Sequence, residues 1–324
     1  MPGEFTLIDR YFARPTPSAV LGPGDDCALV QPTPGKQLAV TTDMLVAGTH
    51  FFPDTDPERL GWKALAVNLS DLAAMGATPR WVTLAGALPT VDEAWLAKFA
   101  TGFFACAERF GVDVIGGDTT RGPLNLCITA MGEVAPGQAL TRSGAQTGDL
   151  IWVSGRPGLA ALGLAHLQGR VALPEPWPRL CVTQLEKPQP RVALGQALVG
   201  LASAAIDVSD GLLADLGHIA ERSGCAAAVR LVQLPHLPKG AEYNADLRRI
   251  ALECQLAGGD DYELCFTAPG SATQAIGQLA ARLDLPLWCI GEMHAGEAGN
   301  VTVFDPDGKP VSFEQTGYDH FAHG

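Results

Sequence analysis

The sequence predicts an α/β fold arranged in two domains. Segments with the pattern of strands alternate with helix-like segments along most of the chain, which favours α/β layers. The chain has 324 residues, which is long for one hydrophobic core and comfortable for two. The turn-rich stretch SGAQTGD, which begins at Ser143, interrupts the alternation before it starts again. We therefore expect an N-terminal domain over residues 1–147 and a C-terminal domain over residues 148–324.

The first half carries the clearest helix signals. Residues 56–77 are predicted to form a helix that Asp56 caps, Pro57 begins and Gly76 ends. A second helix is expected over residues 92–111, where a glycine again ends the pattern. Strands are expected over residues 37–45, 79–89, 112–120 and 124–134. The glycines of the third strand are expected to open it into a turn.

The second half follows the same alternation with more interruptions. Proline-rich connections are expected around LPEPWPRL and EKPQPRV. A helix is expected from about residue 191, and a short strand then leads into a helix over residues 211–224. In residues 258–268 a glycine turn precedes a strand. Closing strands are expected over residues 285–293 and 299–309, the second of which ends in a D-P-D-G turn.

The composition limits the classes of partner. A net charge of -13 repels nucleic acid and anionic membrane, and it also repels an anionic substrate unless metal ions invert the local field. The N-terminus lacks the apolar segment of a signal peptide, and no uncharged stretch is long enough to span a bilayer. The eight cysteines form no C-x-x-C pair and are expected to be reduced core thiols. These observations predict a cytoplasmic protein that binds neither nucleic acid nor membrane.

Several common catalytic motifs are missing from the sequence. There is no G-x-x-x-x-G-K-[ST] loop, and no G-x-G-x-x-G opens a helix after a first strand. The motifs G-x-S-x-G and H-E-x-x-H are absent as well. A bound nucleotide is therefore expected to be held mainly through metal ions.

Six segments place aspartates beside glycine or hydroxyl residues. Carboxylate and hydroxyl oxygens are hard ligands that suit Mg²⁺, and glycine lets the backbone approach a phosphate closely. A bound cation would also explain two adjacent carboxylates, Asp25 and Asp26, next to an apolar run. The aspartates of these segments are Asp25, Asp26, Asp43, Asp71, Asp118, Asp207, Asp210, Asp260 and Asp261.

Most of these aspartates have an ordinary structural alternative. Asp210 is placed to cap the helix that follows it, and Asp118 could cap a turn. Asp260 and Asp261 could form a hairpin turn. Asp71 differs, because it falls in the middle of an apolar helix on the face of Asn68, where an unpaired carboxylate is costly. We therefore interpret Asp71 as a ligand and leave both roles open for the others.

The basic residues near these segments also have two possible roles. His50 follows Asp43 closely, so it either packs or contacts a substrate. Lys63, Arg121 and Arg142 either lie in solvent or neutralise phosphate.

Nine segments occur in a fixed order along the chain, from Gly3 to Phe321. They are GEFTLIDRYF, GDDCALV, TTDMLVAGTHF, KALAVNLSDLAAMGA, IGGDTTRGPL, ALTRSGA, IDVSDGLLADLGHI, GGDDYELCF and GYDHF. Single segments are shared across the aminoimidazole-ribonucleotide synthetase-like superfamily. The ordered set resembles the thiamine-monophosphate kinase family.

The resemblance implies a fold and an assembly. The fold is a two-domain aminoimidazole-ribonucleotide synthetase-like fold of α/β layers. Its N-terminal domain binds ATP and metal and pairs its sheet with a second copy in a homodimer. Its C-terminal domain is an α/β sandwich that contributes to the substrate site.

The resemblance also implies roles for individual residues. Ligands of several Mg²⁺ ions are implied at Asp26, Thr41, Thr42, Asp43, Asp71, Asp118, Asp207 and Asp210. ATP contacts are implied at Gly117, Asp118, Arg142 and Ser209. Contacts with thiamine phosphate are implied at His50, Asp260 and Tyr318. Asp260 stands where many relatives carry Glu, and of the adjacent pair Asp25 and Asp26 only Asp26 is expected to face the metals.

The reaction implied is ATP-dependent phosphorylation of thiamine monophosphate to thiamine diphosphate. The acceptor phosphate oxygen already carries charge, so a direct in-line transfer needs no protein nucleophile, and we assign no catalytic base. Three alternatives remain at this point. One is another ATP-dependent enzyme of the superfamily, the second is a metal-dependent phosphohydrolase, and the third is a nucleotide-binding scaffold without turnover.

Overall fold

The chain folds into two compact units. The structure is a computed structural model, and it describes residues 4–235, 245–313 and 317–318. The first unit comprises Met1–Leu72 and Ala77–Gly137, and the second comprises Ala73–Gly76 and Gln138–Gly324. The division into domains after residue 147 stays a prediction. Gly3 and residues 319–321, which belong to the matching segments, lie outside the described residues.

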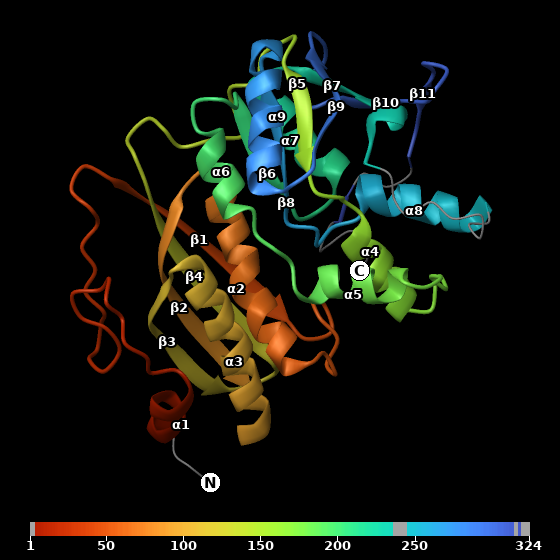
Figure 1. Ribbon diagram of the computed structural model, residues 1–324. Coiled ribbons are helices and arrows are strands. Elements are labelled where there is room, and N and C mark those ends of the chain that lie inside the picture. Colours follow the sequence, from red (N-terminus) through yellow and green to blue (C-terminus); the bar gives the residue numbers. More distant parts are fainter. Residues whose placement is uncertain (1–3, 236–244, 314–316, 319–324) are drawn as a thin grey trace. The chain divides into compact units, whose positions relative to one another are not determined.

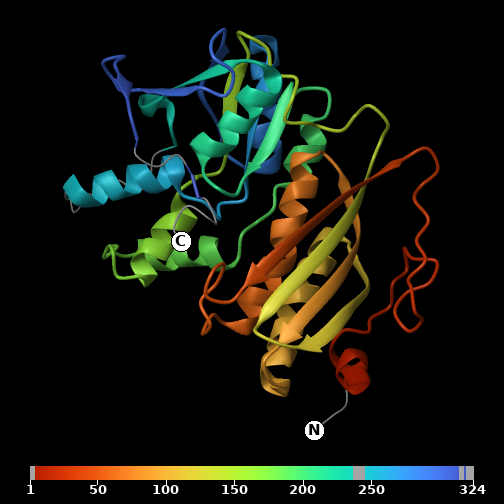
Figure 2. The same ribbon diagram turned by 180° about the vertical axis from the view of Figure 1, so that it is seen from behind.

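The first unit is a four-stranded sheet with helices on one face. Its sheet has the strand order β1-β4-β2-β3. Strand β4 is antiparallel to both β1 and β2, whereas β2 and β3 run parallel. Figures 1 and 2 show α2 and α3 against the same face of this sheet. The elements are α1 (Glu4–Tyr11), β1 (Gln37–Val46), α2 (Pro57–Ala74), β2 (Thr78–Leu88), α3 (Glu93–Phe110), β3 (Asp113–Arg121) and β4 (Asn125–Val134).

The two long helices begin and end where the sequence predicts. Oδ1 of Asp56 accepts hydrogen bonds from the N–H groups of Glu58 and Arg59, both at 3.1 Å, and so caps α2. Asp92 caps α3 in the same way through its side chain. Gly76 follows α2 and has a positive φ, which glycine adopts without steric cost.

The glycine turn expected within residues 112–120 is wrong. Strand β3 continues through Gly116 and Gly117 to Arg121. Gly117 serves a close contact between strands rather than a turn. A Cβ on Gly117 would lie 1.9 Å from the carbonyl oxygen of Leu84 in β2, so no larger residue fits there.

The second unit is built on a seven-stranded sheet. Its strand order is β11-β10-β7-β9-β5-β8-β6. The strands are β5 (Leu150–Ser154), β6 (Ala204–Val208), β7 (Ala226–Arg230), β8 (Glu263–Ala268), β9 (Leu287–His294), β10 (Val301–Phe304) and β11 (Pro310–Val311). The helices are α4 (Leu159–Leu167), α5 (Trp177–Glu186), α6 (Val192–Leu198), α7 (Leu212–Ser223), α8 (Ala245–Ala257) and α9 (Thr273–Leu283), with short 3-10 turns at Leu231–Gln233 and Gly270–Ala272.

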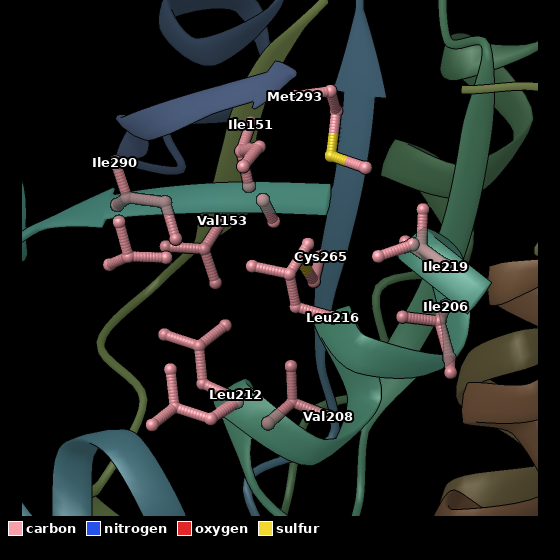
Figure 3. Close-up of a cluster of buried hydrophobic side chains, with 14 of the residues drawn as sticks. Ile151, Val153, Ile206, Val208, Leu212, Leu216, Ile219, Cys265, Ile290 and Met293 are labelled. Atoms are coloured by element: carbon pink, nitrogen blue, oxygen red, sulfur yellow. The ribbon is translucent and has the colours of Figure 1, made fainter. Parts of the chain in front are cut away.

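The main core of the second unit lies between α7 and the central strands. Figure 3 shows Leu212, Leu216 and Ile219 of α7 among the side chains of these strands. Leu212 and Leu216 are fully buried, as are Val153 of β5 and Cys265 of β8. Because these side chains exclude water, the core fixes the position of the loop that joins β6 to α7. That loop carries two of the predicted site residues, Ser209 and Asp210.

A second apolar cluster joins α4, α5 and α8. It contains Leu162, Cys181 and Cys254, all buried. The sequence predicts only a proline-rich connection where α5 lies, and this expectation is wrong. Pro178 falls in the first turn of α5, where a missing N–H costs no hydrogen bond, so proline does not prevent this helix.

No helix in the described part of the chain is long and apolar enough to cross a membrane. All eight cysteines are free thiols, and Cys106, Cys181, Cys225, Cys254 and Cys265 are buried. Cys27 is exposed, and Cys127 and Cys289 are half-buried, so the expectation of core cysteines holds for most of them.

Candidate functional site

In the first unit, β1 and α2 bring polar side chains together on the helix-covered face of the sheet. The hydroxyl of Thr41 donates a hydrogen bond to Oδ2 of Asp71. The backbone N–H of Asp43 donates to Oδ1 of Asn68 at 3.0 Å. Thr41 and Asp43 share one face of β1 because side chains alternate along a strand. Asn68 and Asp71 are three residues apart and share one face of α2, as the sequence predicts.

The contact between β1 and α2 buries hydrogen-bonding groups on one face of a largely apolar helix. Asn68 is fully buried, and its amide donates to the carbonyl oxygen of Ala64 at 3.1 Å. Asp71 is half-buried. The hydroxyl of Thr41 offsets part of the cost of removing this carboxylate from water. Oxygen atoms of Thr41, Asp43 and Asp71 therefore lie along one contact between a strand and a helix.

Other predicted ligands of the first unit lie on the opposite face of the sheet. The hydroxyl of Thr42 lies 2.9 Å from that of Thr129 on β4. Thr129 is paired with Thr83 of β2, and Asp118 is paired with Ala85 two residues further along β2. By this register Asp118 shares the face of Thr42, because directly opposed residues point the same way. The predicted ligands of the first unit thus divide between two faces of one sheet.

His50 is held by hydrogen bonds at the end of β1. Its Nδ1 accepts a hydrogen bond from the N–H of Val46 at 3.0 Å. The neutral ring therefore carries its proton on Nε2 and presents an N–H donor there. Nζ of Lys63 donates to the carbonyl oxygen of His50 at 3.5 Å. Lys63 is buried, so the solvated alternative for this side chain is wrong.

Asp26 lies at an exposed loop tip between two anchors. Ser18 donates both its N–H and its hydroxyl to Oδ2 of Asp113, at 2.7 and 2.5 Å. Thr33 donates in the same way to Glu133, at 2.7 and 2.9 Å. Burial acts to raise the pKa of Glu133, but the two hydrogen bonds from Thr33 and the charges of Arg80 and Lys36 together lower that pKa. The loop that presents Asp26 is therefore tied at both ends to the first unit's sheet.

In the second unit, Asp215 rather than Asp210 caps α7. Oδ2 of Asp215 accepts hydrogen bonds from the N–H groups of Ser209, Asp210 and Gly211, at 3.1, 3.2 and 3.2 Å. The N-cap position is Gly211, which makes no side-chain cap bond. The cap role predicted for Asp210 is therefore wrong. Asp215 satisfies those three amides from inside the helix and leaves the Asp210 side chain available for another role.

Asp215 has an unusual electrostatic environment. It is 3% exposed and lies near the carboxylate of Asp210. Burial and, second, the charge of Asp210 raise the pKa of Asp215 to about 7, although the three N–H donors act in the opposite direction. The sequence analysis missed this residue. Its one signal was a carboxylate within the first turn of a predicted helix.

Backbone hydrogen bonds bring four predicted site residues together in the second unit. The N–H of Asp260 donates to the carbonyl oxygen of Ser209 at 2.9 Å, and the N–H of Tyr318 donates to that of Asp210 at 2.9 Å. The hydroxyl of Tyr262 donates to Oδ1 of Asp260 at 2.9 Å. Predicted metal, ATP and substrate residues thus meet beyond the end of β6. Asp207, also a predicted ligand, is buried within β6 itself.

The hairpin-turn alternative for Asp260 and Asp261 is wrong. These residues connect α8 to β8, and Asp260 and Tyr262 both have left-handed backbones, with φ of 67° and 52°. Asp261 is buried and accepts hydrogen bonds from the N–H groups of Gly158 and Ala160. Glu263, the first residue of β8, is buried and forms an ion pair with the half-buried Arg191.

Arg142 lies outside this hydrogen-bonded group. Its side chain is exposed, and its carbonyl oxygen accepts a hydrogen bond from the hydroxyl of Ser223 at 3.4 Å. The carbonyl oxygen of the adjacent Thr141 accepts a hydrogen bond from the N–H of Ala205 at 2.9 Å. This bond places the segment of Thr141 and Arg142 beside β6. Arg121, the other predicted phosphate clamp, is exposed at the end of β3.

The predicted metal ligands form small groups rather than one cage. Within the described residues, no three His, Cys, Asp or Glu side chains lie close enough together to hold a metal ion. The donors are nevertheless oxygen atoms. Mg²⁺ is commonly bound by one or two carboxylates together with waters and substrate phosphates, so these small groups fit that ion.

Comparison with known proteins identifies the family. Residues 24–134 match the family described as AIR synthase related protein, N-terminal domain, and residues 146–304 match its C-terminal domain. The thiamine-monophosphate kinase of Salmonella typhimurium is 50% identical over 99% of this chain and 98% of its own. The chain belongs to the thiamine-monophosphate kinase family. The resemblance seen in the sequence is confirmed, and so are the α/β fold and the assignment to a kinase.

Solved structures of the family have the same fold. The thiamine-monophosphate kinase of Stenotrophomonas maltophilia is 50% identical and gives a TM-score of 0.86, covering 95% of this chain and 98% of that one. AaThiL complexed with AMPPCP and TMP is 30% identical, with a TM-score of 0.72 and 91% of each chain covered. Of these two structures, that of AaThiL contains AMPPCP and TMP.

Proposed function

We propose that this protein transfers the γ-phosphoryl group of ATP directly to thiamine monophosphate, which yields thiamine diphosphate and ADP. The observation that carries the proposal is the meeting of Ser209, Asp210, Asp260 and Tyr318 in the second unit. In this group a predicted nucleotide contact and a predicted metal ligand lie next to two predicted substrate contacts. The AaThiL structure with AMPPCP and TMP supports the same pair of ligands.

We propose that several Mg²⁺ ions assist this transfer. Asp26, Thr41, Thr42, Asp43, Asp71, Asp118, Asp207 and Asp210 would hold them. When bound, these ions would neutralise the phosphates that a protein of net charge -13 otherwise repels. Thr41 orients the carboxylate of Asp71, and Asp215 holds the backbone of Asp210, so the Asp71 carboxylate and the Asp210 loop are positioned before a ligand arrives.

The remaining residues would bind and orient the two substrates. Gly117, Asp118, Arg142 and Ser209 would contact ATP. Nε2–H of His50, together with Asp260 and Tyr318, would hold thiamine monophosphate. No protein nucleophile is required, because the acceptor is an oxygen of a phosphate that is already charged. Positioning and charge neutralisation would provide most of the rate enhancement.

We also propose a cytoplasmic homodimer. The open face of β1 carries Leu38, Val40 and Met44, which are 41%, 61% and 53% exposed. These side chains alternate with those that face α2, so they form an apolar strip, interrupted by Thr42, on the uncovered face of the sheet. A second copy paired through this face would cover the strip. The eight free thiols fit a reducing compartment.

Product analysis tests the proposed reaction. Purified protein is incubated with Mg-ATP and thiamine monophosphate, alongside controls without acceptor and with free thiamine. Thiamine diphosphate and ADP in equal amounts are expected. ADP and free phosphate formed without an acceptor would make the protein a phosphohydrolase instead. Binding of Mg-ATP without turnover would refute thiamine monophosphate as the acceptor.

A further inference from the structure

Asp261 is a buried acid with an unusual partner. Its side chain accepts hydrogen bonds from the N–H of Gly158 at 2.6 Å and from the N–H of Ala160 at 3.3 Å. These amides belong to the start of α4, whose N-cap residue is a glycine without a side chain of its own to offer. Asp261 therefore caps a helix that lies far away in the sequence. Burial raises its pKa well above the usual value.

The residues on both sides of Asp261 have strained backbones. Asp260 and Tyr262 adopt left-handed conformations that residues with a Cβ rarely take. Their N–H groups donate to the carbonyl oxygens of Ser209 and Val208, at 2.9 and 2.8 Å. Such strain persists only where surrounding contacts enforce it, and it is concentrated at functional sites. Here it aims the carboxylate of Asp260, which the Tyr262 hydroxyl also holds.

The helix end that binds Asp261 has little room to move. Gly158 has a φ of +95°, and a Cβ on it would lie 2.5 Å from Cα of Gln255 in α8. The start of α4 is thus pressed against the backbone of α8. From α5, Nε2 of Gln184 donates to the carbonyl oxygen of Asp261 at 3.3 Å. Three helices that share one apolar cluster therefore hold this residue.

We propose that Asp261 is a positioning residue for the substrate site. Its bonds to the start of α4 hold the loop of Asp260, Asp261 and Tyr262 in place. The loop in turn holds Asp260 in the orientation that binds thiamine monophosphate. This inference rests on the proposed function. It assigns Asp261 a much larger effect on the thiamine side of the reaction than on the nucleotide side, because Asp215 also holds the N–H groups of Ser209 and Asp210.

Steady-state kinetics of Asp261→Ala and Asp261→Asn test the proposal. The alanine variant is expected to raise KM for thiamine monophosphate by about tenfold or more, since it leaves two buried amides unpaired and frees the loop. KM for ATP should change by less than about twofold. The asparagine variant keeps one acceptor oxygen and should fall between alanine and wild type. Equal increases in both KM values, or no change in either, would overturn the proposal.

A matched control uses another left-handed aspartate. Asp284 has a φ of 49° at the end of α9 and is exposed. Asp284→Asn should leave both KM values at the wild-type level. If the alanine variant does not fold, Gln184→Leu removes the smaller contact to the carbonyl of Asp261 and should raise KM for thiamine monophosphate by about twofold to threefold.

Hydrogen exchange separates this proposal from the proposed function. The amides of Asp260 and Tyr262 should be protected in the wild type and should exchange faster in Asp261→Asn, while amides of β9 remain unchanged. Unchanged exchange at these two amides would refute the anchoring role. A wild-type protein that does not phosphorylate thiamine monophosphate would refute the proposed function, and the exchange measurement would still decide whether Asp261 holds the loop.

Discussion

Thr41 and Asp43 in the first unit contact side chains of α2, which is the next element along the chain. Ser209 and Asp210 in the second unit meet Asp260 and Tyr318, which come from two distant segments. The contacts also differ in kind. Every contact of the first group involves a helix side chain, which meets a side chain or a backbone N–H of the strand, whereas backbone N–H and carbonyl groups make most of the second.

The difference has a consequence for mutation. In the first unit, removing one side chain should remove a predicted ligand and little else, because regular elements hold the backbone. In the second unit, the loops themselves depend on buried carboxylates such as Asp215 and Asp261. Changes at those two positions should therefore alter stability and loop geometry as well as ligand binding.

The largest expected effect is that of Asp71→Asn in the first unit. The variant keeps an oxygen for the hydroxyl of Thr41 but loses the charge that would bind metal, so kcat should fall by about 100-fold or more. The melting temperature should fall by only a few degrees. Asp54→Asn, in an exposed loop of the same unit, is the control and should keep full activity. Near-normal turnover of Asp71→Asn would refute the metal-site assignment.

In the second unit, Asp215→Ala should cost stability. Three N–H groups lose their acceptor, and we expect the free energy of unfolding to fall by about 2 kcal/mol. Urea denaturation measures this change. His218→Ala, at an exposed position of the same helix, should change it by less than about 0.5 kcal/mol. Equal losses from the two variants would mean that Asp215 does not cap α7.

The open face of the first unit gives a third test. Val40→Asp would place a charge in the apolar strip of both copies, so the dimer dissociation constant should rise by at least about tenfold. Sedimentation velocity over a range of concentrations measures it. Val91→Asp, which lies outside the strip, should leave association unchanged. A wild-type protein that is monomeric at all concentrations would refute the homodimer.

The raised pKa of Asp215 predicts a pH dependence. The folded state binds this proton more tightly than the unfolded state, so its contribution to stability is fully present below about pH 4 and is lost as the pH rises through about 7. Relative to Asp215→Asn, the wild type should lose up to about 1 kcal/mol per pH unit across that window. If the free energy of unfolding changed equally with pH in the two proteins between pH 4 and 7, the raised pKa of Asp215 would be contradicted.

The smallest expected effect concerns the anchors of the Asp26 loop. Ser18→Ala removes one hydroxyl donor from Asp113 and should cost about 1 kcal/mol of local stability. Amides between Ser18 and Thr33 should then exchange hydrogen several-fold faster, whereas amides of α7 should not change. Thr101→Ala, whose exposed hydroxyl bonds within α3, is the matched control. If exchange in Ser18→Ala became faster to the same extent throughout the first unit, the effect of this hydrogen bond would not be confined to the loop.

Local patterns in the sequence were sufficient for the two long helices of the first unit and for placing Asn68 and Asp71 on one helix face, but they did not predict α1. Caps, glycine stops and three-residue spacing act between near neighbours, so the sequence displays them directly. The ordered motifs were sufficient for the family as well. The same local reasoning placed a turn at Gly116 and Gly117 and a cap at Asp210, and both were wrong. In the first case the deciding contact came from a strand that is distant in the sequence. In the second case it came from a residue later in the same helix.

The alternation of elements, the acidic segments and their order can thus be obtained from the sequence, because periodicity and composition are properties of neighbouring residues. The tertiary structure was needed to show that Thr42 and Asp118 share one face of a sheet while Thr41 and Asp71 meet on the other. It was also needed to find Asp261, whose partners lie at the start of α4. Burial and contacts between distant segments depend on how the whole chain packs, and no single stretch of sequence carries that information.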